Sequence, residues 1–186
     1  DEVLSVFGRL GEWLASGLWD TDPDLIKLDK GLTRGYLPPG ATMCTRDITD
    51  VLNTGGYLAH GFTYSGHPAT TAAGLANLEI LEREQLIPRV KTDVGPYFQK
   101  KLAELKDHPA VGEVRGYQLI GAIEILPRGG RAALASPAIL GTKAAAIARK
   151  EGVIVRGIRD LIAIAPPLVI SHSEIDQVFT AVAKTL

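Results

Sequence analysis

The sequence lacks the features that mark several large classes of protein. Its single cysteine, Cys44, allows neither an intramolecular disulfide nor a cysteine-based zinc site, and it suits a reducing compartment. No apolar run approaches the roughly 20 residues that cross a bilayer. The 20 Lys and Arg residues are balanced by 21 Asp and Glu residues, so there is no basic footprint for nucleic acid. The composition therefore predicts a cytoplasmic protein that binds neither nucleic acid nor membranes.

Familiar motifs are missing as well. There is no Gly-x-Gly-x-x-Gly fingerprint, P-loop or nucleophile elbow. His60 and His67 have no third ligand within sequence range, so no metal site is predicted. The chain opens on Asp-Glu, where a secretory signal would be basic and then apolar. What remains has the composition of an ordinary globular protein, at a length that suits one domain or one domain with part of another.

The spacing of apolar residues predicts a mixed α/β chain in two parts. The first part is rich in Gly, Pro and Thr and contains short elements, and helices are expected over 68–85 and 94–105. From residue 110 onward the pattern predicts a compact α+β unit, in which Ser171 and Glu174 can form a helix capping box. Its expected elements are one or two strands over 111–126, a loop over 127–137, a helix over 142–151, paired strands over 153–155 and 161–164, and a last helix over 175–182.

One lysine is placed as a reactive amine would be. The apolar residues Leu25, Ile26 and Leu28 predict a strand, and the strand leads into Lys30 and then Gly31. A lysine held at a fixed point on a tight turn can form a Schiff base with a carbonyl compound. The alternative is a solvated surface lysine, which is the commoner state of this residue.

A second candidate is the segment over 60–68, which gathers hydroxyls and glycines just before a predicted helix. The Thr63 hydroxyl, a backbone that glycine allows to approach closely and the free N–H groups of a helix start all favour phosphate. The alternative is a plain loop with a helix cap, in which Ser65 or Thr63 caps the helix and Pro68 occupies its first turn.

Two further charged residues lie at predicted strand ends. Asp1 can supply a carboxylate, although a solvated chain end is the alternative. Arg156 ends the apolar run over 153–155 and can clamp a carboxylate through two parallel hydrogen bonds. The alternative for Arg156 is a surface ion pair with Asp160.

These segments and several others occur in a recognisable order. They are Asp1-Glu-Val, Phe7-Gly-Arg-Leu-Gly-Glu-Trp13, Pro23-Asp-Leu-Ile, Lys30-Gly-Leu-Thr, Gly35-Tyr-Leu-Pro38, His60-Gly-Phe-Thr-Tyr-Ser-Gly-His-Pro68, His108-Pro-Ala-Val-Gly-Glu-Val-Arg-Gly116, Arg156 and Ala165-Pro-Pro-Leu-Val-Ile170. Together they resemble the class III pyridoxal-phosphate-dependent aminotransferases, or ω-aminotransferases, over essentially the whole chain. The resemblance is greatest to the members that use amines or diamines and pass the amino group to pyruvate.

The resemblance implies roles in binding pyridoxal phosphate. Lys30 matches the lysine that forms the internal aldimine and then moves the proton between cofactor and substrate carbon. Asp1 matches the aspartate that pairs with the pyridine nitrogen, and Val3 matches the aliphatic residue packed under the ring. Thr63, with Phe62 beside it, matches the threonine that reaches the cofactor phosphate of a neighbouring subunit. Arg156 matches the mobile arginine that receives the carboxylate of an amino or keto acid.

The implied architecture is fold type I, with the later part of the large domain followed by the C-terminal small domain. We expect residues 1–75 in the large domain, 76–109 as connecting helices and 110–186 as the small domain. A threonine that acts across a subunit boundary implies a homodimer or tetramer. The implied partners are a small-molecule amine donor and a keto-acid acceptor.

The chain also departs from the family pattern. Val6 and Arg159 stand where the family has glycine, and Asp29 and Arg34 stand where it has small residues. The family's chain is more than twice as long, and its earlier half carries most of the phosphate site. We therefore expect these residues alone to form no active enzyme. Two other functions fit the same pattern: a decarboxylase or aminomutase of the same fold, and a non-catalytic fragment or interaction module.

Overall fold

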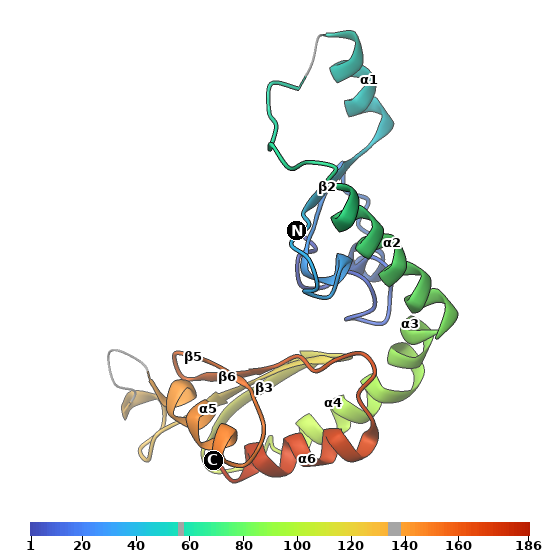
Figure 1. The fold of residues 1–186 in the computed structure, drawn as a ribbon. Helices are drawn as coiled ribbons and strands as arrows, with labels where there is room; N and C mark the ends of the chain where they lie inside the picture. The colour runs from blue at the N-terminus through green and yellow to red at the C-terminus, as the bar shows by residue number, and fades with distance from the viewer. Residues whose placement is uncertain (56–57, 134–138) are drawn as a thin grey trace. The chain divides into compact units, whose positions relative to one another are not determined.

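The computed structural model describes residues 1–55, 58–133 and 139–186, which divide into two compact units (Figure 1). Unit 1 is Asp1–Ile87 and unit 2 is Pro88–Leu186. The boundary falls inside the stretch 76–109 that the sequence predicts as a connector. The assignment of the flanking parts to a large and a small domain stays a prediction.

Unit 1 consists of short elements followed by one long helix. Strands β1 and β2 pair antiparallel, from Leu25 opposite Cys44 to Leu28 opposite Ala41. The chain leaves the first strand and returns through Pro38-Pro39-Gly40, where proline lacks the N–H that a continuing strand needs. The elements are η1 (Ala15–Trp19), β1 (Leu25–Leu28), η2 (Lys30–Leu32), β2 (Ala41–Cys44), α1 (Arg46–Thr54), α2 (Pro68–Arg83) and α3 (Leu86–Arg89), the last of which spans the boundary between the units.

Unit 2 is an antiparallel sheet with helices packed against it. Its strands lie in the order β3-β4-β6-β5, and each neighbouring pair is antiparallel. The elements are the π-helical turn η3 (Val90–Val94), α4 (Gly95–Ala103), β3 (Val111–Tyr117), β4 (Ile120–Ile125), η4 (Arg131–Ala133), α5 (Leu140–Lys150), β5 (Arg156–Ile158), β6 (Leu161–Ile164) and α6 (His172–Ala183).

The core of unit 2 lies between this sheet and the helices α4, α5 and α6, which lie on one side of it (Figure 1). Alternation along the strands turns Ile123 and Ile162 toward the helices, where both are fully buried. Phe98 on α4 and Phe179 on α6 meet edge to face, with ring centroids 5.1 Å apart. The opposite face of the sheet therefore carries the alternate residues, including Arg156 and Ile158 of β5.

Most of the predicted elements of unit 2 are found. The helices α4, α5 and α6 lie on the predicted stretches, the stretch 111–126 forms two strands, and the Ser171–Glu174 capping box is present. The strand predicted over 153–155 is wrong, because β5 begins at Arg156. Gly157 explains the shift: a Cβ on Gly157 would lie 2.4 Å from the carbonyl oxygen of Gly141, so only glycine lets this strand reach α5.

Two other stretches also differ from expectation. Arg46–Thr54 forms the helix α1, which the sequence did not indicate, since the segment is rich in Thr, Asp and Asn and buries none of its residues. The predicted loop over 127–137 contains the short helix η4, and its residues 134–137 lie outside the described residues.

Over the described part of the chain, no helix combines the length and apolar character that a membrane span requires. Within the same residues, no group of three or more His, Cys, Asp and Glu side chains could hold a metal ion.

Candidate active site

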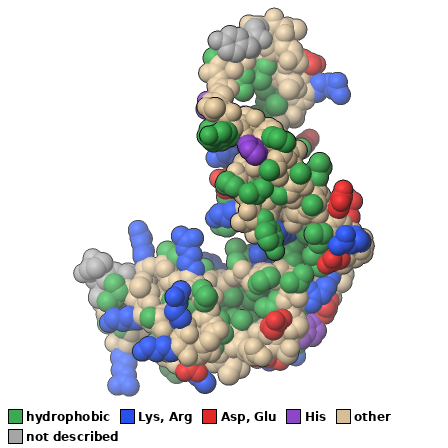
Figure 2. All heavy atoms as spheres, viewed as in Figure 1, with side chains coloured by type: hydrophobic (Ala, Val, Ile, Leu, Met, Phe, Trp, Pro, Cys, Tyr) green, Lys and Arg blue, Asp and Glu red, His purple; other side chains and the backbone are tan. Residues whose placement is uncertain are grey.

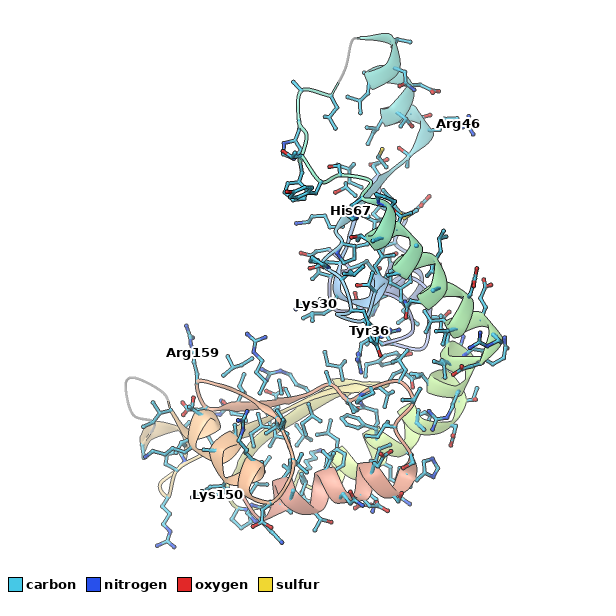
Figure 3. The ribbon with its side chains drawn as sticks, viewed as in Figure 1. Lys30, Tyr36, Arg46, His67, Lys150 and Arg159 are labelled. Carbon is cyan, nitrogen blue, oxygen red and sulfur yellow. The ribbon has the colours of Figure 1, made fainter. Side chains whose placement is uncertain are left out.

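Lys30 is the first residue of η2 and follows β1 after a single intervening aspartate. Its side chain is exposed (Figure 3), and its amine has no ion-pair partner among the described residues. The backbone of the turn that carries Lys30 is held by hydrogen bonds from helix α2. Asn77 on α2 donates hydrogen bonds to the carbonyls of Gly31 at 3.0 Å and Leu32 at 3.1 Å. An accessible amine on a fixed backbone is what covalent capture of a carbonyl requires.

The position of Gly31 leaves little room for a side chain. It is buried, and a Cβ at this position would lie 3.0 Å from the carbonyl oxygen of Val6 and 3.1 Å from a ring carbon of Phe7. The Lys-Gly turn therefore packs directly on the loop that follows Asp1. This contact explains why the sequence has glycine immediately after the lysine.

Asp1 and Val3 lie beside the strand that leads to Lys30. The N–H of Glu2 donates to the carbonyl of Lys27 at 2.9 Å, and Lys27 Nζ lies 3.6 Å from Asp1 Oδ2. The N–H of Val3 donates to Asp1 Oδ1 at 3.0 Å, and the Val3 side chain is half-buried. The structure thus brings Asp1 and Val3 next to β1, three residues before Lys30. The ion pair between Asp1 and Lys27 was not expected from the sequence.

Glu2 fastens this N-terminal segment to η1. Its buried carboxylate accepts hydrogen bonds from the N–H groups of Ala15 at 3.0 Å and Ser16 at 2.6 Å, and from the Ser5 hydroxyl at 2.7 Å. Burial alone would raise the pKa of Glu2, but these hydrogen bonds favour the charged form and the net pKa is lowered. Glu2 is therefore an ionised anchor that fixes the residues on either side of it.

Two arginines, Arg9 in the loop that follows Asp1 and Arg34 just after η2, are partly buried. The Arg34 guanidinium donates to the carbonyl of Phe7, and Arg34 itself adopts a left-handed φ of +55°. Burial lowers the pKa of Arg34. Burial and the charge of Arg34 together lower the pKa of Arg9 to about 10. Arg34, at a position where the family pattern has a small residue, is thus a structural tie to the loop that contacts Gly31.

Phe62 and Thr63 lie on an exposed stretch ahead of α2. Phe62 and Tyr64 meet edge to face at 5.8 Å, and Tyr64 meets His67 in the same way at 6.3 Å. The helix cap expected at Ser65 or Thr63 is wrong. The N-cap of α2 is His67 (Figure 3), whose Nδ1 accepts from the N–H of Ala69 at 3.3 Å, with Pro68 in the first turn. The Thr63 hydroxyl is therefore not used in capping the helix.

Arg156 lies in unit 2, where it is the first residue of β5 rather than the end of an earlier strand. The ion pair with Asp160 that was its alternative does not form. Asp160 Oδ1 instead accepts from the N–H of Leu140 at the start of α5, at 2.9 Å. Arg156 is exposed and has no ion-pair partner among the residues that the structure describes.

The residues of unit 1 fit a cofactor that carries an aldehyde and a basic ring nitrogen. Lys30 supplies the accessible amine on a turn that Asn77 and Gly31 hold in place. Asp1 supplies a carboxylate beside the same strand, where it also pairs with Lys27, and Val3 supplies a half-buried apolar side chain two residues after Asp1. This donor set suits pyridoxal phosphate, which requires one reactive amine and one anionic partner for its ring.

The comparisons with known proteins agree with this fit. The family model described as aminotransferase class-III matches residues 1–186, so the chain belongs to the class III aminotransferases. It is 42% identical to the putrescine–pyruvate aminotransferase of Pseudomonas aeruginosa over all 186 residues, and covers 41% of that protein. It is 35% identical to the mitochondrial gamma aminobutyrate transaminase 1 of Solanum lycopersicum and covers 37% of it.

Solved structures show the same fold. A transaminase with L-alanine matches all of this chain with a TM-score of 0.91 and 38% identity, over 45% of the solved chain. An (S)-enantioselective ω-transaminase from Thermomicrobium roseum matches 98% of this chain with a TM-score of 0.90 and 36% identity. The predicted fold, type I of the pyridoxal-phosphate-dependent transferases, is therefore confirmed. The chain spans about two-fifths of the length of the curated relatives it matches.

Proposed function

We propose that the full-length chain, meaning these residues with whatever precedes or follows them, is an aminotransferase that uses pyridoxal phosphate. It would transfer an amino group from an amine or amino acid to a keto acid, with pyruvate as the acceptor. The observation that carries the proposal is the exposed amine of Lys30 on a turn held by Asn77 and Gly31, beside the segment of Asp1. The 42% identity to a putrescine–pyruvate aminotransferase supports the reaction and the acceptor.

The residues would divide the work as their chemistry allows. Pyridoxal phosphate, when bound, supplies an aldehyde that captures the amine and a ring that accepts the electrons released at the substrate carbon. Lys30 Nζ would take the proton from that carbon and would move it between the substrate carbon and the cofactor. The Asp1 carboxylate would hold negative charge opposite the ring nitrogen, and the side chain of Val3 would pack under the ring. Arg156 would receive the substrate carboxylate through paired hydrogen bonds.

We also propose that the enzyme is a homodimer or tetramer in which Thr63 contacts the cofactor phosphate of a second copy. The support lies in the stretch that carries Thr63. Leu58, Phe62 and Tyr64 are 60%, 67% and 68% exposed, so the stretch presents apolar side chains that water disfavours. A neighbouring subunit would cover them.

The test is amino transfer by the purified full-length chain with pyruvate and a diamine. The unmodified chain should form alanine without releasing carbon dioxide, which also separates transfer from decarboxylation. Lys30→Ala should lower the rate by at least about a thousandfold, because the amine that moves the proton is lost. Lys100→Ala, at an exposed lysine on α4, is the matched control and should keep the rate. Equal rates for Lys30→Ala and the unmodified chain would refute the assignment.

A further inference from the structure

Positive charges are scarce in unit 1. Residues 1–87 contain 6 Lys and Arg residues against 12 Asp and Glu residues. On the face that Figure 2 shows, lysine and arginine side chains are sparse over unit 1 and gather over unit 2. The two lysines of unit 1 are Lys27 and Lys30, three residues apart at the candidate site. Lys30 has a role in the proposed function, whereas Lys27 has none.

The backbone of Lys27 is held on both sides. Lys27 lies inside β1, where it pairs with Thr42 of β2, and its carbonyl accepts from the N–H of Glu2 at 2.9 Å. Glu2 is anchored in turn by the hydrogen bonds to its buried carboxylate. The segment that begins with Asp1 is therefore fixed beside the strand that carries Lys27.

The Asp1 carboxylate has a partner on each oxygen. Asp1 Oδ1 accepts from the N–H of Val3 at 3.0 Å, and Asp1 Oδ2 lies 3.6 Å from Lys27 Nζ. Among the residues that the structure describes, no other side chain pairs with Asp1 or with Lys27. A cation that binds to Asp1 therefore meets a carboxylate that already holds the ammonium group of Lys27.

The ammonium group of Lys27 is not needed to charge this carboxylate. Aspartate is ordinarily ionised at neutral pH without a cationic partner. What Lys27 adds is a positive charge at the place where a protonated ring nitrogen would bring another. Like charges disfavour each other, so Lys27 opposes the binding of a protonated ring at Asp1.

We propose that Lys27 competes with the ring nitrogen of pyridoxal phosphate for Asp1, and thereby sets how strongly the site holds the protonated ring. The inference rests on the proposed function, in which Asp1 holds negative charge opposite that nitrogen. The side chains of Lys27 and Asp1 are 66% and 59% exposed, so water screens their charges and the competition is moderate.

The test measures cofactor binding and not turnover. The cofactor-free full-length chain is titrated with pyridoxal phosphate and with its carbon analogue, in which C–H replaces the ring nitrogen. Both compounds carry the same aldehyde and phosphate, so the ratio of their dissociation constants reports on the nitrogen alone. The unmodified chain should prefer pyridoxal phosphate. Lys27→Met should raise this preference by about threefold, because a like charge is removed.

Three further variants separate the charge of residue 27 from its packing. Lys27→Arg keeps the charge and should keep the preference of the unmodified chain. Lys27→Thr removes the charge with a residue that suits a strand, and should match Lys27→Met. Lys100→Met removes an exposed lysine from α4 and should leave the preference unchanged.

A double variant tests whether the effect acts through Asp1. In Asp1→Asn the ring nitrogen has no carboxylate to keep it protonated. Adding Lys27→Met to Asp1→Asn should therefore change the preference by less than about 1.5-fold. Salt gives a second check on the single variant. The threefold gain in Lys27→Met should shrink between about 0.1 M and about 1 M NaCl, because the screening length falls from about 10 Å to about 3 Å.

The outcomes separate this inference from the proposed function. A preference that rises by less than about 1.5-fold in both Lys27→Met and Lys27→Thr overturns the inference. A preference that falls in these variants also overturns it, since Lys27 would then support Asp1. Neither result alters the test with Lys30→Ala. If the unmodified chain does not distinguish the two compounds, or binds neither, the role proposed for Asp1 fails together with this inference.

Discussion

Glu2 holds the loop that carries Asp1 and Val3 against the start of η1. Three donors converge on a carboxylate that is 5% exposed, so the group is charged, buried and fully hydrogen-bonded. Glu2→Gln should lower the free energy of unfolding of the full-length chain by about 2 kcal/mol at pH 7, because hydrogen bonds to a charged acceptor are lost. Urea unfolding curves measure this difference.

The effect of Glu2 should depend on pH in one direction. Its pKa is lowered in the folded state, so its stabilisation is fully present above the unfolded pKa of about 4.3 and is lost as pH falls through the lower folded value. The difference between Glu2→Gln and the unmodified chain should therefore shrink on acidification. Glu79→Gln, an exposed site on α2, is the control. A difference that stays constant from pH 7 to pH 3 would contradict an ionised anchor.

Gly31 sets the position of Lys30 by steric packing rather than by electrostatics. Gly31→Ala would place a methyl group 3.0 Å from the Val6 carbonyl, and a backbone oxygen has little freedom to move aside. The Lys30 turn should shift and the full-length chain should lose transamination by at least about tenfold, because small displacements of a reactive group are costly. Gly17→Ala in η1 is the matched control, since a Cβ there meets nothing within 4 Å. The transamination rate and the visible absorbance of the lysine-bound cofactor are measured for both variants. Equal rates for Gly31→Ala and Gly17→Ala would contradict the steric role of Gly31.

At the scale of elements, α6 depends on its capping box. Ser171 Oγ accepts from Glu174 N at 3.2 Å, and Glu174 Oε2 accepts from Ser171 N at 2.8 Å. Ser171→Ala should lower the free energy of unfolding by about 1 kcal/mol, because a helix N–H loses its partner. Thr180→Ala, exposed on the same helix, should change it little. Thermal unfolding followed by circular dichroism compares the two, and equal melting temperatures would exclude a stabilising cap.

The same element shows what local sequence predicts. The serine and glutamate of the cap lie three residues apart, and Ile175, Phe179 and Val182 repeat at helical spacing, so both signals lie within one stretch of chain. β5 could not be placed this way. Its start depends on the contact of Gly157 with Gly141, which no local pattern contains. Helix α1 was missed because its residues favour turns and none of them is buried.

In the candidate site, too, local sequence predicted some residues and could not predict others. Lys30 was found because a lysine followed by glycine at the end of an apolar run is a local signal. The supports from Asn77 and Glu2 and the partner of Asp1 were not found, because each joins segments far apart in the chain. Neither a partly buried asparagine nor a buried glutamate has a sequence pattern of its own that identifies its hydrogen-bond partners.

At the scale of the whole molecule, the two units differ in how fully they bury apolar side chains. Unit 2 has a four-stranded sheet and a continuous core, with Phe98, Leu119, Ile123, Ile162, Ile175 and Val182 all fully buried. Unit 1 has a two-stranded sheet and leaves Leu25, Val51 and Leu75 more than half exposed. A two-stranded sheet has only marginal stability by itself. We therefore expect unit 1 to need contacts with residues outside it in order to fold, and unit 2 to fold without such contacts.

This difference predicts that unit 2 folds alone. Residues 88–186, expressed by themselves, should unfold in one cooperative thermal transition and give dispersed amide resonances, because their sheet and helices enclose a complete core. Residues 1–87 should show neither property, since their exposed apolar side chains lack a covering surface. Ile123→Ala within residues 88–186 should lower the stability by about 3 kcal/mol, as expected for a fully buried core position. A non-cooperative transition for residues 88–186, or a loss below 1 kcal/mol for Ile123→Ala, would show that this core does not sustain the fold.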